Sequence, residues 1–415
     1  MPETPLITND AVVLGILMVM LGFVFWGTSS DRPFWRKFYT YVPSLLVCYF
    51  LPSLASTAGL ISGDVSNLYF VSSRYLLPTS LVLLTLSIDY KGILNLGPKA
   101  LIMFVTGTAG IVIGGPLAIL IAASINPEMV GGEGPEAVWR GMTTVAGSWI
   151  GGGANQTAMK EVFGVGDDIF SAWVAVDVIV ANIWMAVLLF AAGRAEAIDR
   201  RTGADASAIH ALRDKVAAYQ ASIAKIPALS ETMLVLAVGF GATAIAHVGA
   251  DLIAPYLAET APYLERFSLT NNFFWIVVIA TTLGMLLAAT RARQLEGVGA
   301  SRIGSALLYV LVASIGMKMN LMAVFEEPEM FLIGGIWMVI HASLMILVAK
   351  LIKAPVFFMA VGSQANVGGA ASAPIVASAF HPSLATVGVL LAVLGYALGT
   401  YAAWFCGQLM RVVAP

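Results

Sequence analysis

Long apolar runs are the feature that most restricts what this chain can fold into. Ten of them come near the roughly 20 apolar residues that an α-helix needs to cross a bilayer. They lie at about 11–27, 38–60, 73–88, 100–123, 169–192, 232–254, 272–290, 303–317, 330–349 and 383–410. Only 11% of the residues are charged, against about 25% in soluble domains. The sequence therefore predicts an all-α polytopic membrane protein, and its net charge of −2 argues against a nucleic-acid partner.

Charges in the connections predict how the chain crosses the membrane, because cytoplasmic loops are enriched in Lys and Arg. Basic and acidic connections alternate only if two further stretches, about 137–165 and 354–381, return to the side from which they enter. We therefore expect about ten crossings and two Gly-rich re-entrant hairpins, with both termini outside. Broken helices that still cross are the alternative, and they would place the basic central linker outside. The leader before residue 11 lacks Lys and Arg, so we expect the first run to be a span and not a signal peptide.

The two Gly-rich stretches resemble each other. Gly147-Ser148-Trp149-Ile150-Gly151-Gly152-Gly153-Ala154-Asn155-Gln156-Thr157 aligns without gaps with Gly362-Ser363-Gln364-Ala365-Asn366-Val367-Gly368-Gly369-Ala370-Ala371-Ser372. Each half of the chain holds five predicted crossings, and an odd number turns the second half upside down. This pattern predicts an inverted-topology repeat, which is common in secondary transporters. The expected organisation is a first repeat at 1–192, a cytoplasmic amphipathic linker at 193–230 and a second repeat at 231–415.

The hairpin tips carry the predicted solute site. Amide and hydroxyl oxygens with freed backbone carbonyls suit a hard cation such as Na⁺, and helix N-termini suit a carboxylate. Close helix packing in lipid is the alternative, but it explains small residues and not adjacent Asn and Gln. The predicted substrate-binding residues are Ser148, Gly152, Gly153, Asn155, Gln156, Thr157, Ser363, Gln364, Asn366, Gly368, Gly369 and Ser372.

Ionisable side chains inside apolar runs are the next indicators of function. Asp177 lies near the middle of run 169–192, where it could bind a cation, relay a proton or pair with a hairpin amide. His341 lies near the centre of run 330–349, as a proton or ligand site or as a hydrogen-bonded structural residue. The predicted Na⁺ ligands are Asp177, Asn155, Thr157 and Asn366, and no other cofactor is expected.

The two Gly-rich motifs in an inverted repeat resemble those of the sodium/glutamate symporter and 2-hydroxycarboxylate transporter families, within a wider group of anion transporters and cation/proton antiporters. They are more closely similar to the YjcL-like family of membrane proteins of unknown function. This resemblance implies an elevator-type core that holds the hairpins and a scaffold that dimerises. The glutamate symporter's tip sequences are not reproduced, so glutamate specificity is not carried over. The adjacent acidic pair of electrogenic Na⁺/H⁺ antiporters is also absent, since Asp177 stands alone.

The sequence thus favours a secondary transporter coupled to Na⁺ or H⁺ that carries a small anionic or zwitterionic organic solute. We expect it to be a multi-pass homodimer in a bacterial inner membrane, surrounded by lipid. A channel or holin-like pore and a cation/proton antiporter are the alternatives, although no ring of charged residues typical of a pore is visible. An enzyme is not expected, because the sequence holds no nucleophile or metal-binding motif.

Overall fold

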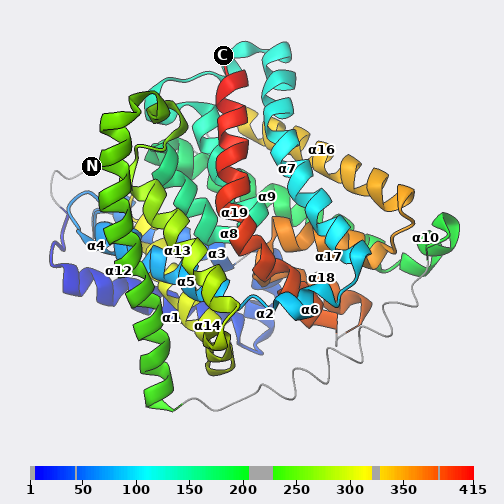
Figure 1. The fold of residues 1–415 in the computed structure, drawn as a ribbon, viewed down its shortest axis with the longest axis horizontal. Helices are drawn as coiled ribbons and strands as arrows, with labels where there is room; N and C mark the ends of the chain where they lie inside the picture. The colour runs from blue at the N-terminus through cyan, green and yellow to red at the C-terminus, as the bar shows by residue number, and fades with distance from the viewer. Residues whose placement is uncertain (1–4, 43, 205–227, 320–327, 382–383) are drawn as a thin grey trace.

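The computed structural model describes residues 5–42, 44–204, 228–319, 328–381 and 384–415. The described residues form helices and no strand, which confirms the predicted all-α class (Figure 1). The predicted amphipathic segment of the linker, about 209–223, lies outside the described residues. The helices of the first half are α1 (Asp10–Thr28), α2 (Pro33–Tyr41), α3 (Ser44–Thr57), α4 (Leu68–Val71), η1 (Ser72–Leu76), α5 (Leu77–Leu86), α6 (Tyr90–Leu94), α7 (Pro98–Ile125), α8 (Val138–Phe163), α9 (Asp167–Ala192) and α10 (Ala195–Thr202). Those of the second half are α12 (Leu229–Thr260), α13 (Asn272–Ala288), η5 (Arg291–Val298), α14 (Ala300–Gly316), α16 (Glu329–Leu351), α17 (Val356–Val367), α18 (Gly369–Phe380) and α19 (Ala385–Val413).

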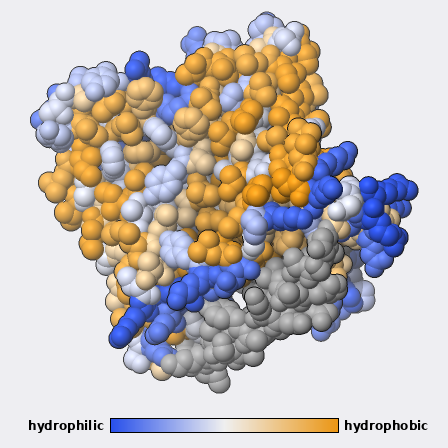
Figure 2. Space-filling model, turned by 45° about the vertical axis from the view of Figure 1, so that its right-hand side comes forward, coloured by the Kyte–Doolittle hydropathy of each residue, from blue (hydrophilic) through white to orange (hydrophobic). Residues whose placement is uncertain are grey.

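Six of the described helices are long and apolar enough to cross a membrane, and two bent pairs raise the number to as many as eight. The two remaining predicted spans correspond to the continuous run α4–η1–α5 and to α14, which has 17 residues. Figure 2 shows a broad apolar surface over the upper part of the molecule, with hydrophilic residues below it, as expected for helices that face lipid. The protein is therefore a polytopic membrane protein, and the count of ten crossings stays a prediction.

Two of the predicted runs contain a sharp bend. The run at 38–60 falls on α2 and α3, which meet at 97°, and α13 meets η5 at 96°. Extended backbone at Val42, with φ −111° and ψ 108°, ends α2. In the second case the Thr290 hydroxyl caps η5 by accepting from the Ala292 N–H at 3.1 Å. The first bend lies inside an uncharged run, where hydropathy does not mark it, and the second lies where the apolar α13 passes into the charged η5.

The helices pack as two bundles, and each bundle takes its members from both halves of the chain. In the first bundle, α1 to α5 pack with α12, α13 and α14; in the second bundle, α7, α8 and α9 pack with α16 to α19. Figure 1 shows α4 and α12 at the left of the molecule and α7 and α16 at the right. The bundles touch where α5 and α13 contact α8 and α19. The chain therefore alternates between the bundles in the order first, second, first, second.

Candidate functional site

The first Gly-rich stretch folds back on itself. The helix α8 is interrupted at Gly152, whose φ of 72° and ψ of −174° are readily adopted only by glycine. Arg140, near its start, donates a hydrogen bond to the carbonyl of Phe163 at its end, and the rings of Trp139 and Phe163 lie 6.0 Å apart. A straight helix would separate residues 23 positions apart by about 35 Å. The element is therefore a helical hairpin, called here the first hairpin.

The second Gly-rich stretch does the same between α17 and α18, called here the second hairpin. Phe357 near its start and Phe380 at its end have ring centroids 5.3 Å apart. Gly369 at the turn has a φ of 55°. A Cβ on Gly368 would lie 1.7 Å from the Ser372 hydroxyl oxygen, so no larger residue fits there without rearrangement.

The two hairpins meet at their tips. A Cβ built on Gly369 would lie 3.8 Å from the Cα of Gly152. Each predicted polar stretch is therefore a hairpin that folds back on itself, and the two tips lie side by side although they are more than 200 residues apart in the chain. Close packing also contributes, because a Cβ on Gly399 of α19 would come within 2.7 Å of the Gly151 Cα.

Asn155 fastens the first hairpin to α19. It is fully buried, and its amide nitrogen donates to the carbonyls of Gly151 at 3.0 Å and of Tyr396 at 3.1 Å. Its side-chain oxygen accepts from the Thr400 hydroxyl at 2.7 Å. Both amide hydrogens are thus used, and one of them occupies a carbonyl freed by the break at Gly152.

Asn366 makes the same set of bonds between the second hairpin and α7. Its amide nitrogen donates to the carbonyls of Gly362 at 2.9 Å and of Phe104 at 3.0 Å. Its side-chain oxygen accepts from the Thr108 hydroxyl at 2.8 Å. In both hairpins the partners are a carbonyl four residues earlier, a carbonyl of the neighbouring helix, and a threonine four residues further along that helix. In this structure Asn155 and Asn366, both predicted as ligands, fasten the first hairpin to α19 and the second hairpin to α7.

Asp177 joins both arms of the first hairpin to α9. The carboxylate is 4% exposed and accepts from Trp149 Nε1 at 2.7 Å and from Gln156 Nε2 at 2.9 Å. Trp149 precedes the break and Gln156 follows it, so one carboxylate holds the two arms together. Among the described residues no Lys, Arg or His forms an ion pair with Asp177, and a buried carboxylate without a counter-charge is costly unless a proton or cation neutralises it.

His341 occupies a neutral junction behind the second hairpin. Its Nδ1 lies 3.1 Å from the Gly107 carbonyl and its Nε2 lies 2.7 Å from the Ser363 hydroxyl. Ser363 also accepts from Trp184 Nε1 at 2.8 Å. Since a carbonyl can only accept and an indole N–H can only donate, the set is satisfied when Nδ1 carries the proton and Ser363 donates to Nε2. His341 and Ser363 therefore link α7, α9, α16 and α17 as hydrogen-bonded structural residues in this structure.

The other predicted polar residues differ in how much of their hydrogen-bonding capacity is unused. The Thr157 hydroxyl bonds to the carbonyls of Gly153 at 3.1 Å and Ala154 at 3.0 Å, within its own helix. Gln364 donates to the Ser372 hydroxyl at 2.6 Å, while its side-chain oxygen is buried and has no partner among the described residues. An unpartnered buried acceptor is costly, so Gln364 is the predicted residue with the clearest capacity left for a ligand.

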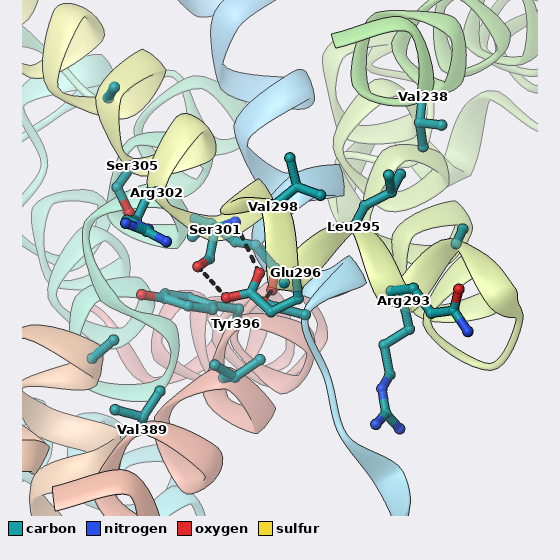
Figure 3. Close-up of a pocket in the computed structure, with 18 of the residues that line it drawn as sticks. Val238, Arg293, Leu295, Glu296, Val298, Ser301, Arg302, Ser305, Val389 and Tyr396 are labelled. Atoms are coloured by element: carbon teal, nitrogen blue, oxygen red, sulfur yellow. Dashed lines mark hydrogen bonds between the residues drawn. The ribbon is translucent and has the colours of Figure 1, made fainter. Parts of the chain in front are cut away.

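A large cavity lies beside the tips, at a place that the sequence does not mark as a binding site. Its volume is about 1300 Å³, and its wall reaches Ala370 and Tyr396 next to the tips (Figure 3). It is otherwise lined by apolar side chains of α1, α12 and α19 and by polar residues of η5 and α14. There Glu296 accepts from the backbone N–H and hydroxyl of Ser301, at 3.0 and 2.7 Å. None of the predicted substrate-binding residues lines it. The available signal was the basic segment 291–302, which was used for topology alone.

The predicted Na⁺ ligands do not form one ready-made group. Asn155 and Asn366 bond to different helices, Thr157 bonds to its own helix, and Asp177 bonds to neutral donors. Among the residues that the structure describes, no three His, Cys, Asp or Glu side chains lie close enough to share a metal ion. The Na⁺ site stays a prediction, centred on Asp177.

Comparison with known proteins agrees with the resemblance seen in the two motifs. The chain is 24% identical over 363 residues to the uncharacterized membrane protein YjcL of Bacillus subtilis (strain 168). The aligned region covers 83% of this chain and 84% of the relative. A family model described as protein of unknown function (DUF819) matches residues 15–413, a range that includes both bundles and both hairpins. The chain therefore belongs to the DUF819 family of proteins of unknown function.

Proposed function

We propose that this protein is a secondary transporter, coupled to Na⁺ or H⁺, for a small anionic or zwitterionic organic solute. The observation that carries the proposal is the meeting of two helical hairpins at Gly152 and Gly369. Broken helices at membrane depth are tolerated where they are buried in protein or line a cavity, and they bind solute and coupling ions in many secondary transporters. A structural role accounts for the amides of Asn155 and Asn366, which fasten the hairpins, but not for the buried side-chain oxygen of Gln364, which has no partner among the described residues.

Alternating access would arise from movement of the second bundle, which holds both hairpins, against the first bundle. The order in which the chain visits the bundles supports an inverted repeat of this elevator type. The first bundle would then be the scaffold that dimerises in the inner membrane. The cavity beside the tips supports access from one side, because it lies between α1, α12 and α14 of the first bundle and α18 and α19 of the second.

Coupling would reside at Asp177. Its carboxylate needs a proton or cation for neutralisation. Neutralisation would weaken the hydrogen bonds that Trp149 and Gln156 donate from the two arms of the first hairpin. Binding of Na⁺ or H⁺ would thereby change how firmly the two arms are held together. Gln364 could supply a further oxygen to the solute from the second hairpin.

Thermal unfolding of the purified protein tests the coupling. An ion that binds only the folded state stabilises it by about 2.7 kcal/mol at a hundredfold excess over Kd. We expect Na⁺, Li⁺ or acid to raise Tm in the native protein and not in Asp177→Asn. Asp168→Asn on the exposed face of the same helix is the matched control. If Na⁺, Li⁺ and acid all leave the Tm of the native protein unchanged, and Asp177→Asn has the same Tm as the native protein, the coupling proposal is wrong.

Flux into liposomes separates the carrier from its alternatives. A carrier saturates with solute concentration and responds to an ion gradient, whereas a pore passes solute in proportion to its concentration. Exchange of Na⁺ for H⁺ without any organic solute would instead support the antiporter.

A further inference from the structure

A cluster of charged residues closes the interface between the bundles at the end away from the cavity. It is called here the charge cluster, and it consists of Tyr69, Arg74, Lys160, Glu161, Asp167 and Lys318. Tyr69, Arg74 and Lys318 belong to the first bundle. Lys160 and Glu161 end the first hairpin, and Asp167 begins α9, so these three belong to the second bundle.

The cavity and the charge cluster occupy opposite ends of the same helices. Arg302 and Ser305, near the start of α14, line the cavity, and Lys318 lies just beyond the end of that helix. At 1.5 Å per residue, the 17 residues of α14 span about 25 Å. The run from η1 to α5 agrees with this, because Arg74 lies near its start and Asp89 of the cavity wall follows its end.

Several bonds of the charge cluster join the two bundles. Arg74 pairs with Glu161 at 2.7 Å, and the Tyr69 hydroxyl also donates to Glu161. Lys318 lies 3.8 Å from Asp167, which also receives the Lys160 ammonium at 2.6 Å. The Lys160 and Lys318 ammonium groups lie 5.1 and 5.0 Å from the Tyr69 ring. The cation–π contact of Lys160 crosses the interface, whereas Lys318 and Tyr69 both belong to the first bundle.

Burial makes these pairs stronger than ordinary surface salt bridges. The Lys160 side chain is 5% exposed and that of Glu161 13% exposed. Their partners Arg74 and Asp167 are 29% and 38% exposed, so water and salt screen these pairs in part, but removal of one partner leaves the largely buried charge of Glu161 or Lys160 poorly compensated. Separation of the bundles at this end requires all the cross-bundle bonds to break together. At the other end the cavity takes the place of such bonds.

We propose that the charge cluster is an ionic latch, which keeps the end opposite the cavity closed and must open before the second bundle can move. The proposal rests on the proposed transport function only for the reason why the bundles move. Which end of the interface is open in a given variant can be measured without any knowledge of the solute.

Cysteine accessibility tests the latch. The native Cys48 and Cys406 are buried, so a membrane-impermeant maleimide should label them little. Ser305→Cys reports on the cavity, and Ser73→Cys, a conservative change at a side chain 2% exposed beside Arg74, reports on the latch end. Each reporter is combined with the latch-breaking pair Glu161→Gln and Asp167→Asn.

We expect the latch-breaking pair to speed labelling at Ser73→Cys and to slow it at Ser305→Cys, each by about tenfold, as a population shift of about 1.4 kcal/mol would produce. A separate variant exchanges the charges of one pair, Arg74→Glu with Glu161→Arg, and keeps Asp167. We expect its labelling rates at both reporters to lie close to the native values. Asp168→Asn is the control for added neutral substitutions at this end.

Two results would overturn the latch. Unchanged rates at both reporters would mean that the charge cluster does not set which end is open. Faster labelling at both reporters, with a lower Tm and no recovery on charge exchange, would mean that it only holds the fold together. A shift in opposite directions would support the latch even if Na⁺ and acid leave Tm unchanged and the coupling proposal fails.

Discussion

The two hairpins share a backbone design and differ in the chemistry buried behind them. Each turns at a glycine with positive φ, and each is fastened by an asparagine to a threonine of a neighbouring span. Behind the first hairpin lies the carboxylate of Asp177, whereas behind the second lies the neutral set formed by His341 and Ser363. The architecture is therefore repeated and the charge is not, which is why we place ion coupling in the first hairpin alone.

The largest expected effect tests whether the two fastenings are equivalent. Asn155→Ala and Asn366→Ala each remove three buried hydrogen bonds, one of them donated by a threonine hydroxyl of the neighbouring span. We expect each change to lower the free energy of unfolding by about 3 kcal/mol. Asn182→Ala, whose amide bonds only to Val178 of its own helix, should cost much less. Thermal unfolding in detergent checks this, and a large difference between the two alanine variants would refute their equivalence.

Substitution of the two turn glycines should show a clearer difference in stability between the hairpins. Gly152 combines positive φ with a ψ of −174°, whereas Gly369 has a φ of 55°. The first conformation is nearly confined to glycine and the second has the left-handed φ that other residues visit at moderate cost. We expect Gly152→Ala to cost about 2–3 kcal/mol and Gly369→Ala about 1 kcal/mol. Equal costs in thermal unfolding would show that the two turns are alike.

Two tryptophans allow the charged and neutral junctions to be compared directly. Trp149 donates to the Asp177 carboxylate and Trp184 donates to the Ser363 hydroxyl. We expect Trp149→Phe to cost about 2 kcal/mol and Trp184→Phe about 1 kcal/mol, because a hydrogen bond to a charged group is the stronger. In an Asp177→Asn background the two phenylalanine variants should become alike. If the difference persists there, the carboxylate is not its source.

The smallest effect concerns the linker and the second hairpin. Asp199 of α10 accepts from the Val356 backbone N–H at 2.9 Å, at the start of the second hairpin. Burial raises the pKa of this carboxyl above its usual range, and the hydrogen bond from Val356 opposes that rise. A raised folded pKa favours the protonated folded form, so this contribution to stability is lost as pH rises from the usual pKa of an aspartate through the raised value.

We therefore expect Asp199→Asn to flatten this part of the pH dependence of Tm and to shift stability by less than about 1 kcal/mol. Tm measured from pH 3 to pH 7 checks this, with Glu196→Gln on the same exposed helix as the control. A variant that keeps the native pH slope would contradict the assignment to Asp199.

Much of the site could be predicted from the sequence because its backbone breaks are local. Three successive glycines at 151–153 and two at 368–369 cannot continue a helix comfortably, and the structure turns at both places. Asp177 was conspicuous because so few charges lie inside apolar runs. Both alternatives considered for Asp177 and His341 at the outset, a bond to a hairpin amide and a hydrogen-bonded structural role, are what the structure shows.

The cavity and the charge cluster could not be predicted in the same way. Arg302 lies in a basic connection of the sequence and Glu161 near the end of the first Gly-rich stretch, and nothing local indicates that one faces a cavity and the other bonds to Arg74. The bend at Val42 lies inside the predicted run 38–60 and was not indicated by hydropathy, whereas the bend near Thr290 coincides with the predicted end of the run 272–290.

The sequence by itself determined that the chain is an all-α membrane protein, where the two Gly-rich stretches break and which polar groups are buried at those two breaks. Only the tertiary structure decided that Asn155 meets α19, that Asn366 meets α7 and that the two tips touch. The physical reason is that apolar helices are all compatible with lipid, so hydropathy does not choose their neighbours. That choice is made by close contact of small residues and by hydrogen bonds between helices, and these depend on residues far apart in the chain.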